Sequence, residues 1–247
     1  RRRKMINKKI YLLIIWSITI TIMCISTVHF GNKAWKVIKN GLKIHFNDNE
    51  EISWDYDKSD KFSFNQDLDE FTTLDVDGSV MRLNIKQGDT YRISAEYNRN
   101  YLKPEVNVKN GKLSVSQPAS KNFYRGSTRC EVTIYIPGGK KLDDAAISID
   151  VGEINLKDFN CEKLSASTDV GELSISNVDF TNLYAESDVG ELSIKTVNPL
   201  QEYNLDLSTD IGEIRIDGEH KRHNFNQTGT SGKKIIAKTN IGELRIK

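Results

Sequence analysis

The chain has 247 residues, and its near-balance of 35 Lys and Arg against 34 Asp and Glu hides a strong asymmetry. Residues 1–44 hold ten basic and no acidic residues, whereas residues 45–247 hold 25 basic and 34 acidic residues. An acidic body excludes nucleic acid as the expected partner, because phosphate contacts need clustered Lys and Arg. The hydrophobic content of 38% is enough for one or two domains with a buried core.

The first predicted elements are a basic cytoplasmic head, residues 1–9, and a transmembrane helix, residues 10–30. The helix segment contains no Asp, Glu, Lys or Arg, and about 20 mostly apolar residues are needed to cross the hydrocarbon core. Six Lys or Arg precede it, which predicts a single-pass cell-membrane protein with an extracytoplasmic body. A cleaved secretory signal is the alternative, and it would export the body equally.

Residues 31–69 are predicted to form a juxtamembrane linker and an N-terminal cap. Lys33, Trp35 and Lys36 begin a basic stretch that suits either a membrane-interface segment or an extended linker. Residues 45–69 are rich in Asp, Asn, Phe and Trp. We expect them to cover the open end of the next domain, because an exposed terminal strand invites aggregation.

The body repeats one motif, S-x-D-V-G-E-L-x-I, with spacings of 19, 19, 22 and 30 residues between its glycines. The five glycines of the motif are Gly152, Gly171, Gly190, Gly212 and Gly242. Around each glycine every second residue is apolar, which is the period of a β-strand. One unit cannot bury its apolar face alone, but stacked units spaced by about 4.8 Å can. The sequence therefore predicts an all-β fold, a β-solenoid of about 19-residue rungs over residues 70–247.

Alignment of the five units gives six columns of equivalent positions whose side chains are predicted to point into the core. Each rung is expected to form hydrogen bonds with the rung that follows it in the sequence. One of these columns immediately precedes the glycines; it contains Val151, Val170, Val189, Ile211 and Ile241. The segments around Gly78 and Gly111 are predicted to be earlier, degenerate rungs with the same glycine turn. The longer spacings before Gly212 and Gly242 predict insertions at a corner, where loops are tolerated.

These features resemble the bacterial putative-adhesin family of unknown function. The resemblance rests on the basic head, the single apolar segment and the repeated S-x-D-V-G-E-L-x-I, and it covers about residues 40–247. It implies a β-helix-like repeat domain in an exported, membrane-anchored protein of the cell envelope, in a family sometimes linked to envelope-stress responses. It offers no catalytic residues and no cofactor.

Two rows of acidic residues flank the glycines on the outward face. The first row is Asp150, Asp169, Asp188 and Asp210, with Asn240 in the fifth unit. The second row is Glu153, Glu172, Glu191, Glu213 and Glu243. Like charges on stacked rungs would lie about 5 Å apart, which costs energy unless something screens them.

Three interpretations of the acidic rows remain open. The residues could only form the turn, with Asp bonding backbone N–H groups and Glu solvated. They could bind Ca²⁺ or Mg²⁺ through carboxylate oxygens. They could also attract a cationic protein or peptide partner. Arg215 and Arg245, two residues after the last two glutamates, are expected to neutralise those units in part.

No nucleophile, metalloprotease or phosphate-binding motif is present, so we expect a non-enzymatic binding or sensing module. A passive structural spacer or adhesin is the main alternative. A polysaccharide-acting enzyme would need unlike residues in a groove, whereas this outer face is uniform.

Two smaller clusters leave alternatives open. His220 and His223 could hold a metal with Glu219, or lie in a solvated loop. The alternation of the strands places the side chains of Cys130 and Cys161 on the inward face, which indicates buried thiols or a disulfide. The third cysteine, Cys24, is placed in the membrane helix.

Overall fold

The protein is described by a computed structural model over residues 61–117 and 128–247. The predicted head, the membrane helix and residues 31–60 of the linker and cap lie outside the described residues. Within the described ranges, no helix is long and apolar enough to span a bilayer. Of the predicted cap, residues 62–67 form a strand at one end of the sheet.

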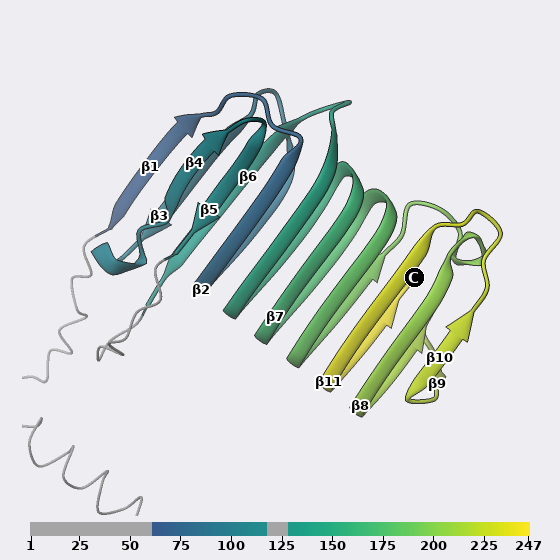
Figure 1. Cartoon of the computed structure of the whole chain (residues 1–247). Coiled ribbons are helices and arrows are strands. Elements are labelled where there is room, and N and C mark those ends of the chain that lie inside the picture. Colours follow the sequence, from purple (N-terminus) through teal and green to yellow (C-terminus); the bar gives the residue numbers. More distant parts are fainter. Residues whose placement is uncertain (1–60, 118–127) are drawn as a thin grey trace, which may run out of the picture. The chain divides into compact units, whose positions relative to one another are not determined.

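The described chain folds as one 11-stranded sheet with the strand order β1-β3-β6-β2-β7-β11-β8-β10 (Figure 1). Off this path, β4 pairs with β5, β5 with β2, and β9 with β8. The strands are β1 (Phe62–Asp67), β2 (Thr73–Gly88), β3 (Arg92–Tyr97), β4 (Glu105–Lys109), β5 (Lys112–Ser116), β6 (Cys130–Pro137), β7 (Lys141–Lys195), β8 (Asn204–Ile216), β9 (Glu219–Lys221), β10 (Asn224–Gln227) and β11 (Lys234–Ile246). Two short 3-10 helices, η1 (Asn100–Leu102) and η2 (Leu200–Glu202), complete the elements.

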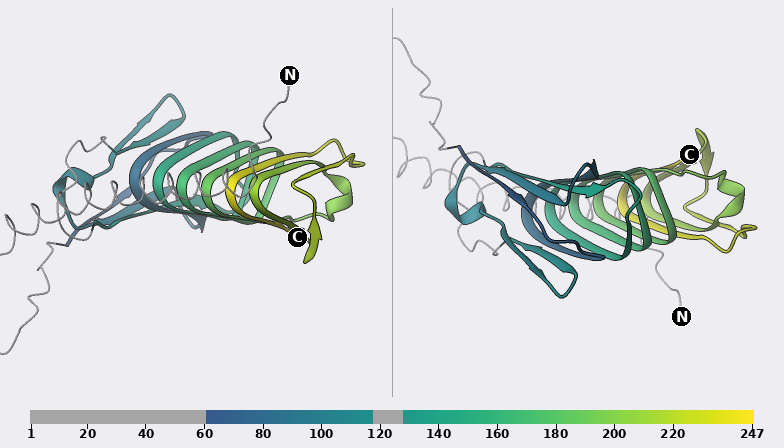
Figure 2. Two further views of the ribbon diagram at one scale, coloured as in Figure 1. Left: turned by 90° about the horizontal axis from the view of Figure 1, so that it is seen from below. Right: turned by 90° about the horizontal axis from the view of Figure 1, so that it is seen from above.

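The repeats form stacked rungs, as predicted. β7 runs through three of them, and β2, β11 and β8 supply three more in parallel register, with Gly242 opposite both Gly190 and Gly212. In Figure 2 the successive rungs are seen as arcs piled along one axis. Each rung bends at its glycine, so that the strand before the glycine faces the strand after it across a shared interior.

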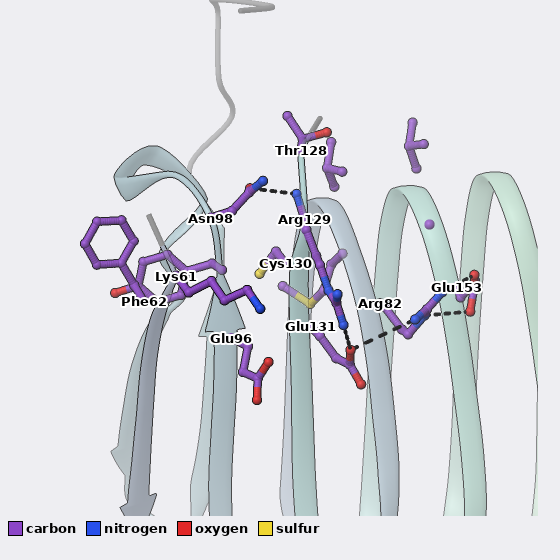
Figure 3. A pocket seen from close by; sticks show the side chains of 15 residues that line it. Lys61, Phe62, Arg82, Glu96, Asn98, Thr128, Arg129, Cys130, Glu131 and Glu153 are labelled. Carbon is purple, nitrogen blue, oxygen red and sulfur yellow. Dashed lines mark hydrogen bonds and ion pairs between the residues drawn. The ribbon is translucent and has the colours of Figure 1, made fainter. Parts of the chain in front are cut away.

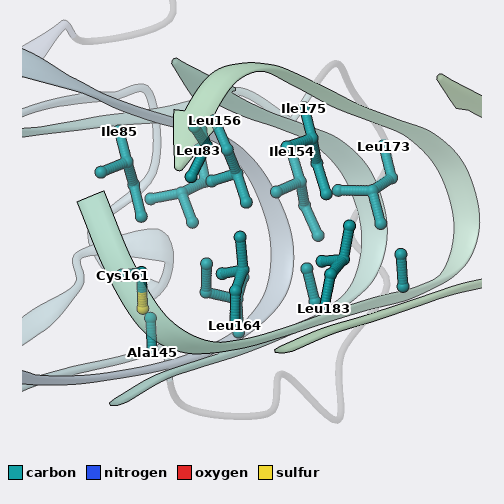
Figure 4. Close-up of a cluster of buried hydrophobic side chains, with 14 of the residues drawn as sticks. Leu83, Ile85, Ala145, Ile154, Leu156, Cys161, Leu164, Leu173, Ile175 and Leu183 are labelled. Carbon is teal, nitrogen blue, oxygen red and sulfur yellow. The ribbon is translucent and has the colours of Figure 1, made fainter. Parts of the chain in front are cut away.

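The interior holds the predicted inward side chains. Figure 4 shows Leu164 and Leu183 on one side and Leu156, Ile154 and Ile175 on the other. All five are at most 2% exposed. Full burial of such a side chain contributes about 1.5–3 kcal/mol, so the repeated aliphatic columns supply the stability that one rung lacks. Another of the six predicted inward columns carries mostly hydroxyl groups and is also buried; it contains Ile149, Thr168, Ser187, Thr209 and Thr239.

The repeated glycine is required by close approach between rungs. A Cβ built on Gly171 would lie 1.7 Å from the carbonyl oxygen of Gly152, and its φ of +148° is unfavourable for other residues. The first rung has Met81 at this position, opposite Gly152. On the other side of β2, β5 pairs only as far as Asp77 and β6 only from Arg82 onward, so no described strand lies against Met81 there.

The two earlier glycine turns were predicted wrongly. Gly78 lies opposite Ile149 rather than opposite a glycine, and its missing side chain leaves room for Met81. Gly111 and Asn110, with φ of 72° and 52°, form the tight turn of an antiparallel β4–β5 hairpin. Two adjacent positive φ values define a type I′ hairpin, which is a different structure from a rung corner.

The order of the last two rungs also differs from the expectation that each rung bonds to the next. β11, the last strand of the chain, lies between β7 and β8. Accordingly Gly242 packs on Gly190, and Gly212 packs on Gly242. The 30-residue spacing between Gly212 and Gly242 accommodates β9 and β10, which pair antiparallel with β8 at the end of the stack.

Candidate functional site

The outer surface of the glycine corner carries three parallel rows of side chains. Ile149 and Ile154 point into the core, whereas Asp150, Val151 and Glu153 point outward. Two adjacent outward residues occur because the bend at the glycine interrupts the strict alternation of the strand. The corner therefore combines an acidic row, an apolar row and a second acidic row.

The apolar row corrects one of the predicted inward columns. Its five side chains are between 43% and 64% exposed, whereas the prediction placed them in the core. In stack order they are Val151, Val170, Val189, Ile241 and Ile211. We call this row the ridge. Within the described residues, Val197 is the only other large hydrophobic side chain that is exposed.

The first acidic row is not neutralised by cations. Among the described residues, no Lys, Arg or His forms an ion pair with Asp150, Asp169, Asp188 or Asp210. Burial, followed by the charges of Asp169 and Asp77, raises the pKa of Asp150. Asn240 lies in the row between Asp188 and Asp210, and its Nδ2 donates to Asp188 Oδ1 over 3.0 Å. Because Asn240 is uncharged, it lowers the repulsion between carboxylates at the rung where β11 lies between β7 and β8.

The glutamate row, in contrast, is largely paired with arginines. Glu153 accepts two hydrogen bonds of 2.8 Å from Arg82, which lower its pKa. Arg215 contacts Glu213 at 2.9 Å and Glu243 at 3.0 Å, and Arg245 contacts both Glu243 and Glu191. The hydrogen bond from Arg245 is the main cause that lowers the pKa of Glu243.

The roles predicted for Arg215 and Arg245 are thus confirmed. Arg82 was missed, because it lies 71 residues before its partner Glu153 and only the register of β2 against β7 brings the two together. Correct alignment of the first rung on Met81 instead of Gly78 would have found it.

The opposite pKa shifts of Asp150 and Glu153 predict opposite effects of neutralisation. A raised folded-state pKa means that ionised Asp150 opposes folding above its unfolded pKa, and this cost disappears on acidification. A lowered pKa means that ionised Glu153 stabilises the fold, and this gain is lost as the pH falls through its folded pKa. At pH 7, Asp150→Asn should raise the melting temperature and Glu153→Gln should lower it. Each effect should stay below about 1 kcal/mol, because both groups are solvent-exposed.

Thermal unfolding of the two variants and the parent chain, followed by circular dichroism at several pH values, tests this pair. Both differences should shrink on acidification, and that of Asp150→Asn should shrink first, because the pKa of Asp150 is raised and that of Glu153 is lowered. Destabilisation by Asp150→Asn at pH 7 would show instead that its carboxylate supports the turn.

A cleft of about 570 Å³ opens beside the first rung, next to one end of the ridge. Phe62, Tyr97 and Val151 contribute to its lining, together with charged side chains (Figure 3). In Figure 3, Arg82 points toward Glu153, and Arg129 lies over Glu131. Arg82 forms an ion pair with Glu153, and Arg129 forms one with Glu131 at 3.2 Å.

The remaining candidates are not brought together as a site. His220 contacts Glu213 at 2.8 Å, whereas Glu219 contacts Lys221 at 2.9 Å. Over residues 61–117 and 128–247, no group of three or more His, Cys, Asp or Glu is arranged to hold a metal ion. The carboxylates of the two rows lie along the stack, one per rung, rather than around a point.

Cys130 and Cys161 are buried and unpaired. Burial raises the pKa of Cys130 to about 11 and that of Cys161 to about 12. Both groups are therefore protonated at neutral pH and are poor nucleophiles.

The stacked rungs with their glycine corners define a solenoid-like, all-β repeat domain. The Toastrack DUF4097 family matches residues 71–247, so the chain belongs to this family. This match confirms the family resemblance that the sequence showed. No curated protein matches the chain.

The solved structures that resemble this chain include proteins named for adhesion and one named for lipid binding. A putative cell adhesion protein from Clostridium sporogenes matches with a TM-score of 0.62 and 19% identity, over 76% of this chain and 99% of that one. This likeness supports the fold. A putative adhesin from Bacteroides fragilis has a TM-score of 0.35 and 14% identity, over 76% and 97% of the two chains. A putative lipid binding protein from Parabacteroides distasonis has a TM-score of 0.31 and 10% identity, over 77% and 98%.

Proposed function

We propose that this protein is a non-enzymatic binding or sensing module, anchored in the bacterial cell membrane with its β domain outside the cytoplasm. The anchor is assigned from the uncharged, apolar residues 10–30 and the six basic residues before them. The partner is a cationic protein or peptide that binds the corner of the solenoid. A role in envelope-stress sensing is part of this proposal, through the family resemblance.

One observation carries the choice of partner, namely the contrast between the two acidic rows. The glutamate row is matched with Arg82, Arg215 and Arg245 from the chain itself. The aspartate row receives no such cation from the described residues, and the ionisation of Asp150 is opposed by its surroundings. A charged row that the fold leaves uncompensated favours an external cation-bearing partner.

The second candidate function is a passive spacer or adhesin whose rungs only build length. The regular register of the rungs and the small, repeated corner are the observations that favour it. A spacer does not require the aspartates, so the two functions make different predictions.

Binding of a fluorescent oligolysine to the full chain in nanodiscs of zwitterionic lipid tests the proposal. Neutralisation by Asp150→Asn, Asp169→Asn and Asp188→Asn together should weaken binding at least tenfold, and binding of the parent chain should fall with added salt. The matched control is Asp67→Asn, Asp89→Asn and Asp143→Asn, which removes the same charge from three exposed sites away from the corner.

The control variant should bind nearly as well as the parent chain. Equal loss in both variants would mean that only net charge matters, and absence of binding to the parent chain would favour the spacer. Circular dichroism of each variant establishes that the fold is kept.

A further inference from the structure

From the ridge and its acidic borders, we infer that the corner is a docking site for an amphipathic, basic helix of a partner polypeptide. This inference rests on the proposed function and specifies its partner. The cationic side chains of the helix face the acidic rows, and its apolar stripe lies on the ridge. The sequence alone did not point to this site, because it placed the ridge in the core.

The ridge is the dominant exposed apolar feature of the described structure. Its five β-branched side chains come from five consecutive rungs, and stacking keeps them in line. Such a line is not needed for the fold, since the core columns on both sides of the corner are already buried. Clustered exposed apolar groups bordered by polar ones mark interaction sites.

The negative charge of the two acidic rows indicates which kind of molecule can bind the ridge. If two copies packed ridge to ridge about a two-fold axis, the aspartate row of each copy would face either the aspartate row or the glutamate row of the other. Both rows carry more acids than bases, so this pairing is repulsive. An anionic membrane surface is disfavoured for the same reason. A polypeptide with basic residues beside apolar ones complements all three rows at once.

Spacing favours a helix over an extended strand. Rungs repeat at about 4.8 Å, so five rungs extend over about 19 Å. A helix presents one apolar position per turn of about 5.4 Å, close to the rung spacing, and about 13 residues cover this length. Same-face residues of a strand repeat at about 6.6 Å and would lose register after one or two rungs. A helix with an apolar stripe at spacings of three and four residues therefore fits the ridge.

The test uses a synthetic peptide of about 15 residues, with leucines spaced alternately by three and four and lysines beside them, and a scrambled peptide of the same composition. Binding to the full chain in zwitterionic nanodiscs is measured for both, with empty nanodiscs as background. The patterned peptide should bind at least tenfold more tightly than the scrambled one. Val170→Ser should weaken binding of the patterned peptide about tenfold and leave that of the scrambled peptide unchanged.

Val197→Ser is the matched control, because Val197 is 46% exposed and Val170 is 47% exposed. Only the ridge variant should lose affinity. Equal binding of the two peptides, with no effect of Val170→Ser, would overturn the helix inference while leaving the cationic partner in place. Failure of both peptides to bind would overturn the proposed function as well. Sedimentation that shows a dimer of the parent chain, lost in Val170→Ser, would make a second copy the occupant and overturn the inference.

Discussion

A chain that carries Gly171→Ala is expected to lose more than about 4 kcal/mol of unfolding free energy, or to fail to fold. Gly171 lies in the middle of the stack, and an added Cβ would meet the carbonyl oxygen of Gly152 at 1.7 Å. Both atoms belong to the main chain or are fixed to it, so no side chain can move to relieve the contact. The φ of +148° adds a further cost of about 1–2 kcal/mol for a residue with a Cβ.

Gly218→Ala separates the two causes. Gly218 also has a positive φ, +84°, but a Cβ added there would have no neighbouring atom within 4 Å, so only about 1–2 kcal/mol should be lost. Urea unfolding followed by circular dichroism suits the comparison. Fluorescence is less suitable, because the described residues contain no tryptophan: Trp16, Trp35 and Trp54 all precede residue 61. Similar stabilities of the two variants would show that the rungs separate easily and that the close approach is not essential.

The rung architecture could be predicted from the sequence because local chemistry repeats with the structure. The period of two identified strands, and glycine at regular spacing identified the corner. Leu173 and Ile175 are buried as predicted, and the outward positions of Asp169 and Glu172 are also correct.

The ridge could not be predicted by counting alternation alone. Val170 is two residues after the buried Thr168, so strict alternation places it inside. The bend at Gly171, with φ +148°, changes the direction of the residue before it. An apolar residue in this position carries no local signal that it is exposed.

The rung order could not be predicted either, because the units are nearly interchangeable. Gly242 fits on Gly190 in the same way that Gly190 fits on Gly171. The local motif therefore does not encode the order, which appears only in long-range pairing such as that of Arg245 with Glu191. The contact between Arg82 and Glu153 was missed for a related reason, since the first rung lacks the motif.

Gln117→Leu is expected to cost about 2–4 kcal/mol, because one backbone group of the first rung and one of η1 would lose hydrogen bonds. The Oε1 atom of Gln117 accepts from the N–H of Val80 over 2.8 Å, and its Nε2 donates to the carbonyl of Leu102 over 2.8 Å. The side chain is buried, so solvent cannot replace these contacts. Amide exchange at Val80 should accelerate in the variant, and the urea midpoint should fall.

Gln87→Leu, at an exposed position of β2, should change stability by less than about 0.5 kcal/mol. A similar small effect of Gln117→Leu, with unchanged exchange at Val80, would show that this corner does not depend on the side chain. The expected large effect has a structural cause. Inside the stack each corner bonds to the rungs on both sides, but residues 78–81 of β2 have no described strand on the outer side. Gln117 supplies there the hydrogen-bonding groups that a further rung would provide, and so allows the stack to begin.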